Sequence, residues 1–352
     1  MNENDINDKR KQTDFKSITF SKFKRTKVKK ELIQNMLDGK IEQACYWCSE
    51  YICAGLFIDI WDVIILFMSK YIHTGNPKLP IYIALRIQNF KDILFNGYID
   101  NEIKMRNNTK IRKLFAEVIC TLCLSRKKHT MEPVKINKED DFNITLLSSK
   151  LKAPNMSYVN DIFKNDDPKE IFIAANELSY HMSNESNNSF SACYWIEWII
   201  EYENICRRNK ENCYVERRDW NNVQDKYQSD LIWIVWDILF KKASKKSLII
   251  VKIINSLYEI FCLKYTNNNR KKRRFVLYFA VLILTENINT TINITNNNQV
   301  INNVVSKIDL IYKEVKKNEV TPNTNYLFNG LETSSLDKTI KRIEKMNEIL
   351  GI

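Results

Sequence analysis

Glycine and proline are scarce in this sequence, with only six of each in 352 residues. Sandwiches and barrels need frequent turn residues, so this scarcity argues against both. Neither G-x-x-x-x-G-K-[ST] nor G-x-G-x-x-G occurs, which leaves nucleotide hydrolysis through those two loops unsupported. The residues that are present are 44% hydrophobic and 11% aromatic, enough for a large core. We therefore expect an all-α fold of long helices joined by polar loops.

Histidine is scarcer still, and no catalytic constellation accompanies it. His73, His129 and His181 are the only three, and none falls in H-E-x-x-H spacing. Asp167 and Glu170 flank Pro168, a pattern typical of a helix N-terminus capped by Asp167 rather than of a metal site. The sequence thus gives no catalytic residue, no cofactor and no metal ligand, and we expect a protein that is not an enzyme.

Long apolar runs of the kind that cross membranes are also missing. The run from Tyr51 to Ser69 contains Asp59 and Asp62, and the apolar stretch 275–285 is too short to span a bilayer. The first residues, MNENDINDKRKQTDFK, do not contain the apolar core of a secretory signal. Nine cysteines scattered through apolar segments suggest free thiols. We expect an intracellular protein that is not secreted and has no membrane span.

Apolar spacing with a helical period divides the chain into two helical halves. The first predicts helices from about Leu32 to Gly55 and at 58–71, 80–95 and 109–125. The predicted organisation is a flexible basic arm (1–28), a first helical repeat (29–128), a linker or loose segment (129–165), a second repeat (166–286), and an Asn-rich loop with C-terminal helices (287–352). The last segment predicts helices at 300–317 and 335–350, the second amphipathic.

Three segments recur in the same order in the two halves, which indicates an internal duplication. A-C-Y-W stands at 44–47 and again at 192–195, and Trp61–Asp62 is matched by Trp236–Asp237. An Asn run, a basic cluster and an apolar helix follow at 107–123 and at 267–284. Each half is expected to hold four or five helices.

Two C-x-x-C pairs, Cys45/Cys48 and Cys120/Cys123, could in principle hold zinc or act as a redox pair. In the second repeat, however, Ile196 stands at the position of Cys48. A metal or redox site needs both thiols, whereas a core position accepts either residue. The favoured interpretation is therefore that these cysteines are core residues.

Positive charge is concentrated in three windows of a chain whose net charge is +12. Residues 1–30, 106–128 and 241–274 hold ten, seven and eleven Lys/Arg against four, one and one acidic residues. Segregation on this scale suggests an anionic partner. Two clusters stand at corresponding positions of the halves and are the predicted phosphate-binding residues: Lys110, Arg112, Lys113, Arg270, Lys271, Lys272, Arg273 and Arg274. Nothing indicates base-specific reading, so the predicted contacts are to the phosphate backbone.

The stretches QACYWCSEYICAGLFIDIWDVIILFMSKYIHTGNPKLP, ACYWIEWIIEYE and SDLIWIVWDILF resemble an all-helical protein family encoded by large nucleocytoplasmic DNA viruses, over about residues 30–287. The resemblance implies the host cytoplasm, a virus factory or the virion as location, but no activity. ACYWCSEYICAG followed by KYIHTGNPKLP is also similar, more weakly, to the helical collar of clamp-loader-type ATPases, without the ATPase part.

The expected function is therefore non-enzymatic association with nucleic acid, DNA or RNA, as an accessory of viral replication, transcription or genome packaging. An acidic viral protein could take the place of the nucleic acid. The alternative is a structural or assembly protein of the virion that acts through protein–protein contacts. On the first reading, reversing Lys271, Lys272, Arg273 and Arg274 to Glu should abolish anion binding without unfolding the chain.

Overall fold

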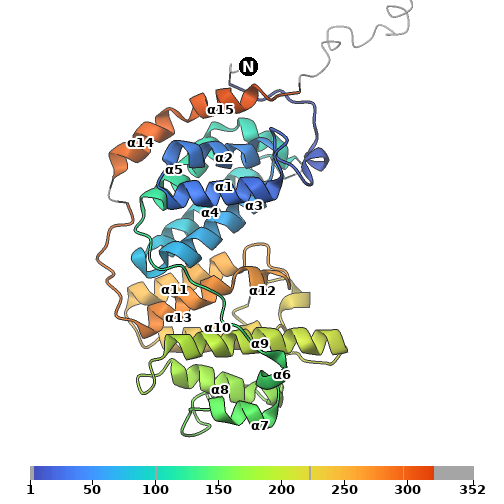
Figure 1. Cartoon of the computed structure of the whole chain (residues 1–352), viewed down its shortest axis with the longest axis vertical. Coiled ribbons are helices and arrows are strands. Elements are labelled where there is room, and N and C mark those ends of the chain that lie inside the picture. The colour runs from blue at the N-terminus through green and yellow to red at the C-terminus, as the bar shows by residue number, and fades with distance from the viewer. Residues whose placement is uncertain (1–3, 100, 222, 296, 321–352) are drawn as a thin grey trace, which may run out of the picture.

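The computed structural model describes residues 4–99, 101–221, 223–295 and 297–320. Within these ranges the chain forms fifteen α-helices and no strand, which confirms the all-α prediction. Figure 1 shows two groups of helices stacked along the long axis, α1–α5 in one and α8–α13 in the other. No helix of the described ranges is both long and apolar enough to cross a bilayer.

The first group contains α1 (Arg25–Leu37), α2 (Ile41–Cys53), α3 (Phe57–Phe67), α4 (Leu79–Phe95) and α5 (Thr109–Leu124). The single helix predicted up to Gly55 is two helices, because Gly39 adopts a φ of +70° and breaks the chain between α1 and α2. α2 packs against both α1 and α5, and α4 packs on α5. Trp61, Phe90 and Phe115 meet in the centre, with ring centroids 5.1–5.8 Å apart.

The second group contains α8 (Phe172–His181), α9 (Ser189–Asn209), α10 (Ile232–Ala243), α11 (Leu248–Phe261), the short α12 (Asn269–Lys272) and α13 (Arg274–Thr285). α9 packs against α8 and α13, and α11 packs on α13. These neighbours correspond to those of α2, α1, α5 and α4 in the first group. The duplication itself remains a prediction from the sequence.

The two groups are joined through α4, which packs on α11, and through α13, which packs on the turns at 68–75. Arg273 at the start of α13 reaches across to Asp62 of α3, with Nη2 and Oδ1 3.0 Å apart. His73 lies edge-on to Phe279, with centroids 6.5 Å apart. The halves therefore share a packed boundary that includes a cross-half ion pair.

The predicted flexible arm differs from the structure, because its described part is packed on the first group. Phe15 and Phe20 are fully buried, and Arg10 lies over both rings at 5.0 and 4.7 Å. Residues 16–24 form a tight hairpin whose Ile18 and Lys24 pair as an isolated bridge. Its anchor is the buried carboxylate of Glu50 in α2. That carboxylate accepts hydrogen bonds from the Thr19 hydroxyl (2.9 Å), the Ser21 amide (2.9 Å) and the Ser21 hydroxyl (2.5 Å).

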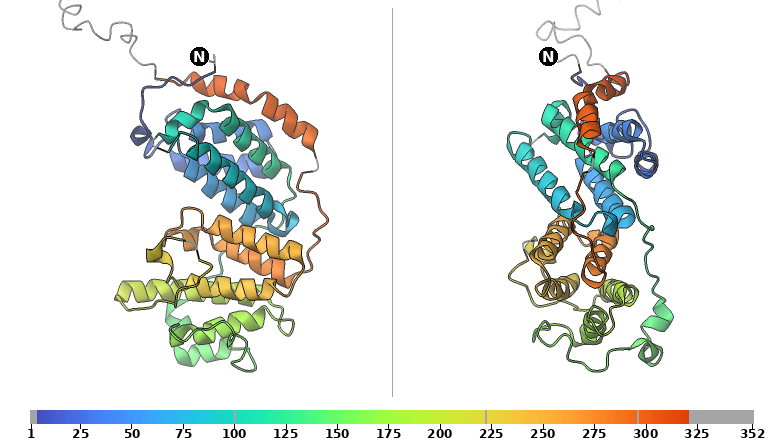
Figure 2. Two further views of the ribbon diagram at one scale, coloured as in Figure 1. Left: turned by 180° about the vertical axis from the view of Figure 1, so that it is seen from behind. Right: turned by 90° about the vertical axis from the view of Figure 1, so that its left-hand side faces the viewer.

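The predicted loose linker also packs, on the second group. Figure 2 shows it running down one side of the molecule from the first group to the second. It carries α6 (Lys138–Asp141) and α7 (Ile144–Leu147). The Trp198 indole of α9 donates a hydrogen bond to the Asp141 carbonyl at 2.8 Å, and Phe142 stacks on Trp198 at 4.9 Å. We call residues 129–151 the strap.

After α13 the chain returns to the first group as α14 (Asn298–Ser306) and α15 (Ile308–Lys316), as Figure 1 shows. α14 packs on α5 and α15 on α2. The helix predicted over 300–317 is thus two helices that meet at Lys307. The helix predicted at 335–350 lies outside the described residues.

Asp167 does not cap a helix, contrary to the sequence pattern. It is buried and accepts two hydrogen bonds from the Arg218 guanidinium, at 2.8 and 2.7 Å. The following turn is a 3-10 helix (Lys169–Ile171), and α8 begins only at Phe172. Asp167 therefore joins the chain around 218 to the start of the second group.

Candidate nucleic-acid interface

The predicted cluster on α5 divides into two exposed lysines and a buried arginine. Lys110 and Lys113 face solvent on the first turns of the helix. Arg112 is only 2% exposed, donates to the Arg106 carbonyl at 2.8 Å and pairs with Asp309 of α15 at 3.1 Å. Its guanidinium also lies 4.1 Å from the centre of the Tyr312 ring. Arg112 therefore fixes α15 to α5 and presents no free donor surface to a phosphate.

Most cations of the cluster at 270–274 also form ion pairs inside the protein. Arg270 and Arg273 are buried, and they pair with Glu203 of α9 and with Asp62 of α3. Arg273 also donates to the carbonyls of Phe261 and Leu263 at 2.8 and 2.6 Å. Burial lowers the pKa of Arg270 to about 10, which is still above neutral pH, so Arg270 stays protonated beside Glu203.

The two remaining paired cations of this cluster face the same helix. Lys271 pairs with Glu201 at 2.7 Å and Arg274 with Glu197 at 3.2 Å. Burial raises the pKa of Glu197, and the neighbouring Arg274 opposes that rise. Only Lys272 is exposed with no carboxylate of the described residues within 4 Å. The prediction of phosphate binding thus differs from the structure at Arg112, Arg270 and Arg273, because all three guanidinium groups are buried in internal ion pairs.

Another basic surface lies at 16–30, in the predicted flexible arm (1–28) and the first two residues of the predicted first repeat. Six lysines of the hairpin and α1 are exposed, and no ion pair joins any of them to a described carboxylate. We call them the N-terminal lysine surface: Lys16, Lys22, Lys24, Lys27, Lys29 and Lys30. They are held on a fixed frame, because Glu50 anchors the hairpin and the Tyr51 hydroxyl donates to the Arg25 carbonyl at 2.9 Å.

The choice between arginine and lysine distinguishes the buried cations from the exposed ones. In both predicted clusters the buried members are arginines, and the exposed, unpaired ones are lysines. Arginine offers a planar fork of donors that suits buried ion pairs, while lysine is strongly hydrated and stays in water. The basic segment 16–30 contains six lysines but one arginine, Arg25, which pairs with Asp59.

The N-terminus of α1 is positively charged, which the helix dipole disfavours. Lys24, Arg25 and Lys27 occupy the N-cap and first turn, where a helix favours negative charge. No side chain caps this terminus and no acidic residue lies in the first turn. Each such cation costs about 0.3–1 kcal/mol at low ionic strength. The arrangement is unfavourable for stability alone and becomes favourable once an anion lies over it.

A cavity of about 310 Å³ extends this surface to the second group. Lys29 of α1 lines it together with Lys272 and Arg273, and Asp59 and Asp62 supply the carboxylates. Those carboxylates pair with Arg25 and Arg273, so Lys29 and Lys272 are the uncompensated charges. The structure therefore places one member of the predicted cluster, Lys272, beside the N-terminal lysine surface.

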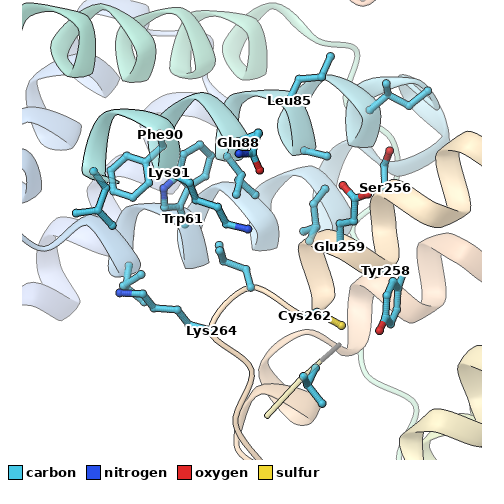
Figure 3. A pocket seen from close by; sticks show the side chains of 18 of the residues that line it. Trp61, Leu85, Gln88, Phe90, Lys91, Ser256, Tyr258, Glu259, Cys262 and Lys264 are labelled. Carbon is cyan, nitrogen blue, oxygen red and sulfur yellow. The ribbon is translucent and has the colours of Figure 1, made fainter. Parts of the chain in front are cut away.

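A second cavity, of about 760 Å³, is an apolar groove between α4 and α11. Figure 3 shows Leu85, Phe90 and Lys91 on one wall, Glu259 on the other and Lys264 at one end. Leu85 and Phe95 of α4 remain 61% and 65% exposed.

The buried indole N–H of Trp61 in this groove has no hydrogen-bond acceptor among the described residues. The same holds for Trp236, its counterpart in the sequence repeat. Each indole is enclosed by aromatic rings, Trp61 by Phe115 at 5.1 Å and Trp236 by Tyr258 at 5.3 Å. The unpaired N–H groups therefore belong to aromatic packing and do not indicate a ligand in the groove.

The cysteines lie in the core, as the sequence indicated. All nine are free, and eight are buried. The Cys45 thiol lies within hydrogen-bonding reach of Cys120, and that contact together with burial raises its pKa. Burial raises the pKa of Cys123 to about 12. Across the described ranges, no three His, Cys, Asp or Glu side chains gather in a way that could hold a metal ion.

Comparison with known proteins adds no relative: no family model, no curated protein and no solved structure matches the chain.

Proposed function

We propose that the chain is a viral, non-enzymatic protein that binds the phosphate backbone of nucleic acid through the N-terminal lysine surface. One observation carries the proposal: six exposed lysines without carboxylate partners stand on one anchored hairpin and helix. Lysines in fixed positions attract phosphates and release their counterions, whatever the base sequence. Lys272, across the cavity from Lys29, adds a seventh cation from the second group.

Salt dependence tests this proposal. Six neutralised phosphates give a slope of log affinity against log salt of about −4 on a single strand and about −5 on a duplex. The measurement is fluorescence anisotropy of labelled DNA and RNA oligonucleotides across a salt series. Reversing Lys24, Lys27 and Lys30 to Glu should weaken binding at least 100-fold at low salt and reduce the slope by about 2 to 3.

A matched control is available in the second group. Lys245, Lys246 and Lys252 are equally exposed, and no described carboxylate pairs with them. Reversing these three changes the net charge by the same amount but leaves the proposed surface intact. Equal losses from both triple variants would show that only the overall charge matters, and the proposed surface would be wrong.

A second candidate is the assembly role, which the apolar groove favours. Leu85 and Phe95 present a large exposed apolar surface of the kind that marks protein contacts. On this reading the protein should fail to bind oligonucleotides at low salt and should self-associate in a concentration-dependent way. Sedimentation velocity of the intact chain, with Phe95→Glu as the variant, distinguishes the two roles.

A further inference from the structure

Trp47 of α2 lies at the edge of the N-terminal lysine surface and remains partly exposed. Its ring meets Phe23 of the hairpin edge-on, with centroids 5.3 Å apart and planes at 65°. The ammonium of Lys27 lies 5.3 Å from the centre of the Phe23 ring. The partly exposed Trp47 ring is thus linked to the ammonium of Lys27 through the Phe23 ring between them.

The Trp47 indole N–H is neither buried nor hydrogen-bonded within the described part of the chain. By contrast, the N–H groups of Trp198, Trp220 and Trp233 donate to Asp141, Asp237 and Tyr227. Hydrogen bonds therefore fix the polar edges of these three indoles, whereas none fixes that of Trp47.

The second group shows what a merely structural tryptophan at this position looks like. Trp195 stands where Trp47 does when the A-C-Y-W motifs are aligned, and it is only 1% exposed. It packs on Trp198, which the strap covers through Phe142. The exposure of Trp47 is thus a property of the first group, where the lysines are, and not of the motif.

We infer that the preferred ligand of this surface is single-stranded nucleic acid, one of whose bases stacks on Trp47. This inference rests on the proposed function. Lysines along the hairpin and α1 contact the backbone, and a base with a free face turns inward onto the indole. A duplex keeps its bases paired and stacked, so it can use the lysines but not the tryptophan. Stacking on one aromatic side chain strengthens binding between about 5-fold and 100-fold, with little dependence on the base.

The experiment compares a labelled single strand of thymidines with a duplex of the same length, at one salt concentration, on the intact protein. We expect tighter binding of the single strand and quenching of tryptophan fluorescence as it binds. Trp47→Leu should weaken single-strand binding about 10-fold, leave duplex binding unchanged and remove most of the quenching. Trp220→Phe, which alters the other partly exposed tryptophan, is the fluorescence control and should change neither affinity.

Three results overturn the inference. The first is equal binding of strand and duplex with no effect of Trp47→Leu, which leaves the lysine surface standing as a duplex or general polyanion site. The second is an equal loss of both ligands in Trp47→Leu. The third, no binding of either ligand at low salt, overturns the proposed function as well. If Trp47→Leu lowers the melting temperature, Trp47→Phe supplies the same ratio of affinities with less loss of packing.

Discussion

α2 and α9 each carry the A-C-Y-W sequence, yet they hold different segments. Aligned on A-C-Y-W, Glu50 of α2 falls at the position of Trp198 in α9. Glu50 receives three hydrogen bonds from the lysine-bearing hairpin, while Trp198 binds the strap through the Asp141 carbonyl and the Phe142 ring. One helix position is thus used to dock two unrelated pieces of chain.

The consequence for surface chemistry follows from what is docked. The hairpin and α1 together present six lysines to solvent, and Trp47 remains partly exposed at their edge. In the 270–274 cluster of the second group, by contrast, Arg270 and Arg274 pair with Glu203 and Glu197 of α9. Positive charge is therefore exposed to solvent at 16–30 and largely paired inside the protein at 270–274.

The largest effect is expected from charge reversal at 271–274. The sequence alone predicted a folded variant that had lost anion binding, but the structure predicts a variant that unfolds. Arg273 is buried against Asp62, and its reversal sets two carboxylates side by side. Breaking a buried pair from one side costs about 3–5 kcal/mol, a large part of a domain's total stability.

Urea unfolding followed by circular dichroism measures this difference. The Lys24, Lys27 and Lys30 reversal is the counterpart in the first group. It should not lower the free energy of unfolding, because the changes at Lys24 and Lys27 remove cations that oppose the helix dipole, each worth about 0.3–1 kcal/mol at low ionic strength. A quadruple variant as stable as the wild type would mean that the Arg273–Asp62 pair does not hold the two groups together.

Glu50→Ala comes next in size. It removes the acceptor of the Thr19 and Ser21 donors, so we expect a loss of about 2–3 kcal/mol and release of the hairpin. Trypsin should then cleave at Lys16 and Lys22, and oligonucleotide affinity should fall, because the lysines no longer stand in fixed positions. Glu50→Gln keeps one carbonyl acceptor and should fall between the two. Unchanged oligonucleotide affinity in the alanine variant would separate hairpin anchoring from binding.

The helical elements and the burial of the cysteines could be predicted from the sequence, because both depend on local apolar periodicity. The sequence could not show which cations of the charged clusters are buried in ion pairs. Arg273 and Asp62 are 211 positions apart, and Arg112 and Asp309 are 197 apart, so no local pattern reveals either pair. The same limit explains the hairpin, whose anchor Glu50 lies about 30 residues further along. The local signal for the buried cations of the predicted clusters is that they are arginines rather than lysines.

A smaller effect is expected from Trp198→Phe, the counterpart of the Glu50 change. Phenylalanine keeps the stacking on Phe142 and Tyr202 but loses the hydrogen bond to the Asp141 carbonyl. Leaving that carbonyl unpaired should lower the free energy of unfolding by about 1–2 kcal/mol and open the strap to protease. Oligonucleotide affinity should not change, since the strap carries none of the proposed binding residues. A parallel loss of affinity would show that the two docking positions are coupled.

The smallest expected effect is that of Lys27→Gln, and the sign of its change in the free energy of unfolding is informative. Lys27 lies in the first turn of α1, where it opposes the helix dipole, whereas Lys30 lies almost one turn further on. Lys27→Gln should therefore raise the free energy of unfolding by about 0.3–1 kcal/mol at low ionic strength, a gain that salt removes. Lys30→Gln should not. Both changes remove one phosphate contact, so both should weaken oligonucleotide binding several-fold and reduce the salt slope by nearly one. A variant that is more stable and binds less well means that Lys27 stands in a position selected for binding against the preference of its own helix. If Lys27→Gln destabilises the protein instead, the contact of its ammonium with the Phe23 ring outweighs the dipole, and the residue is structural.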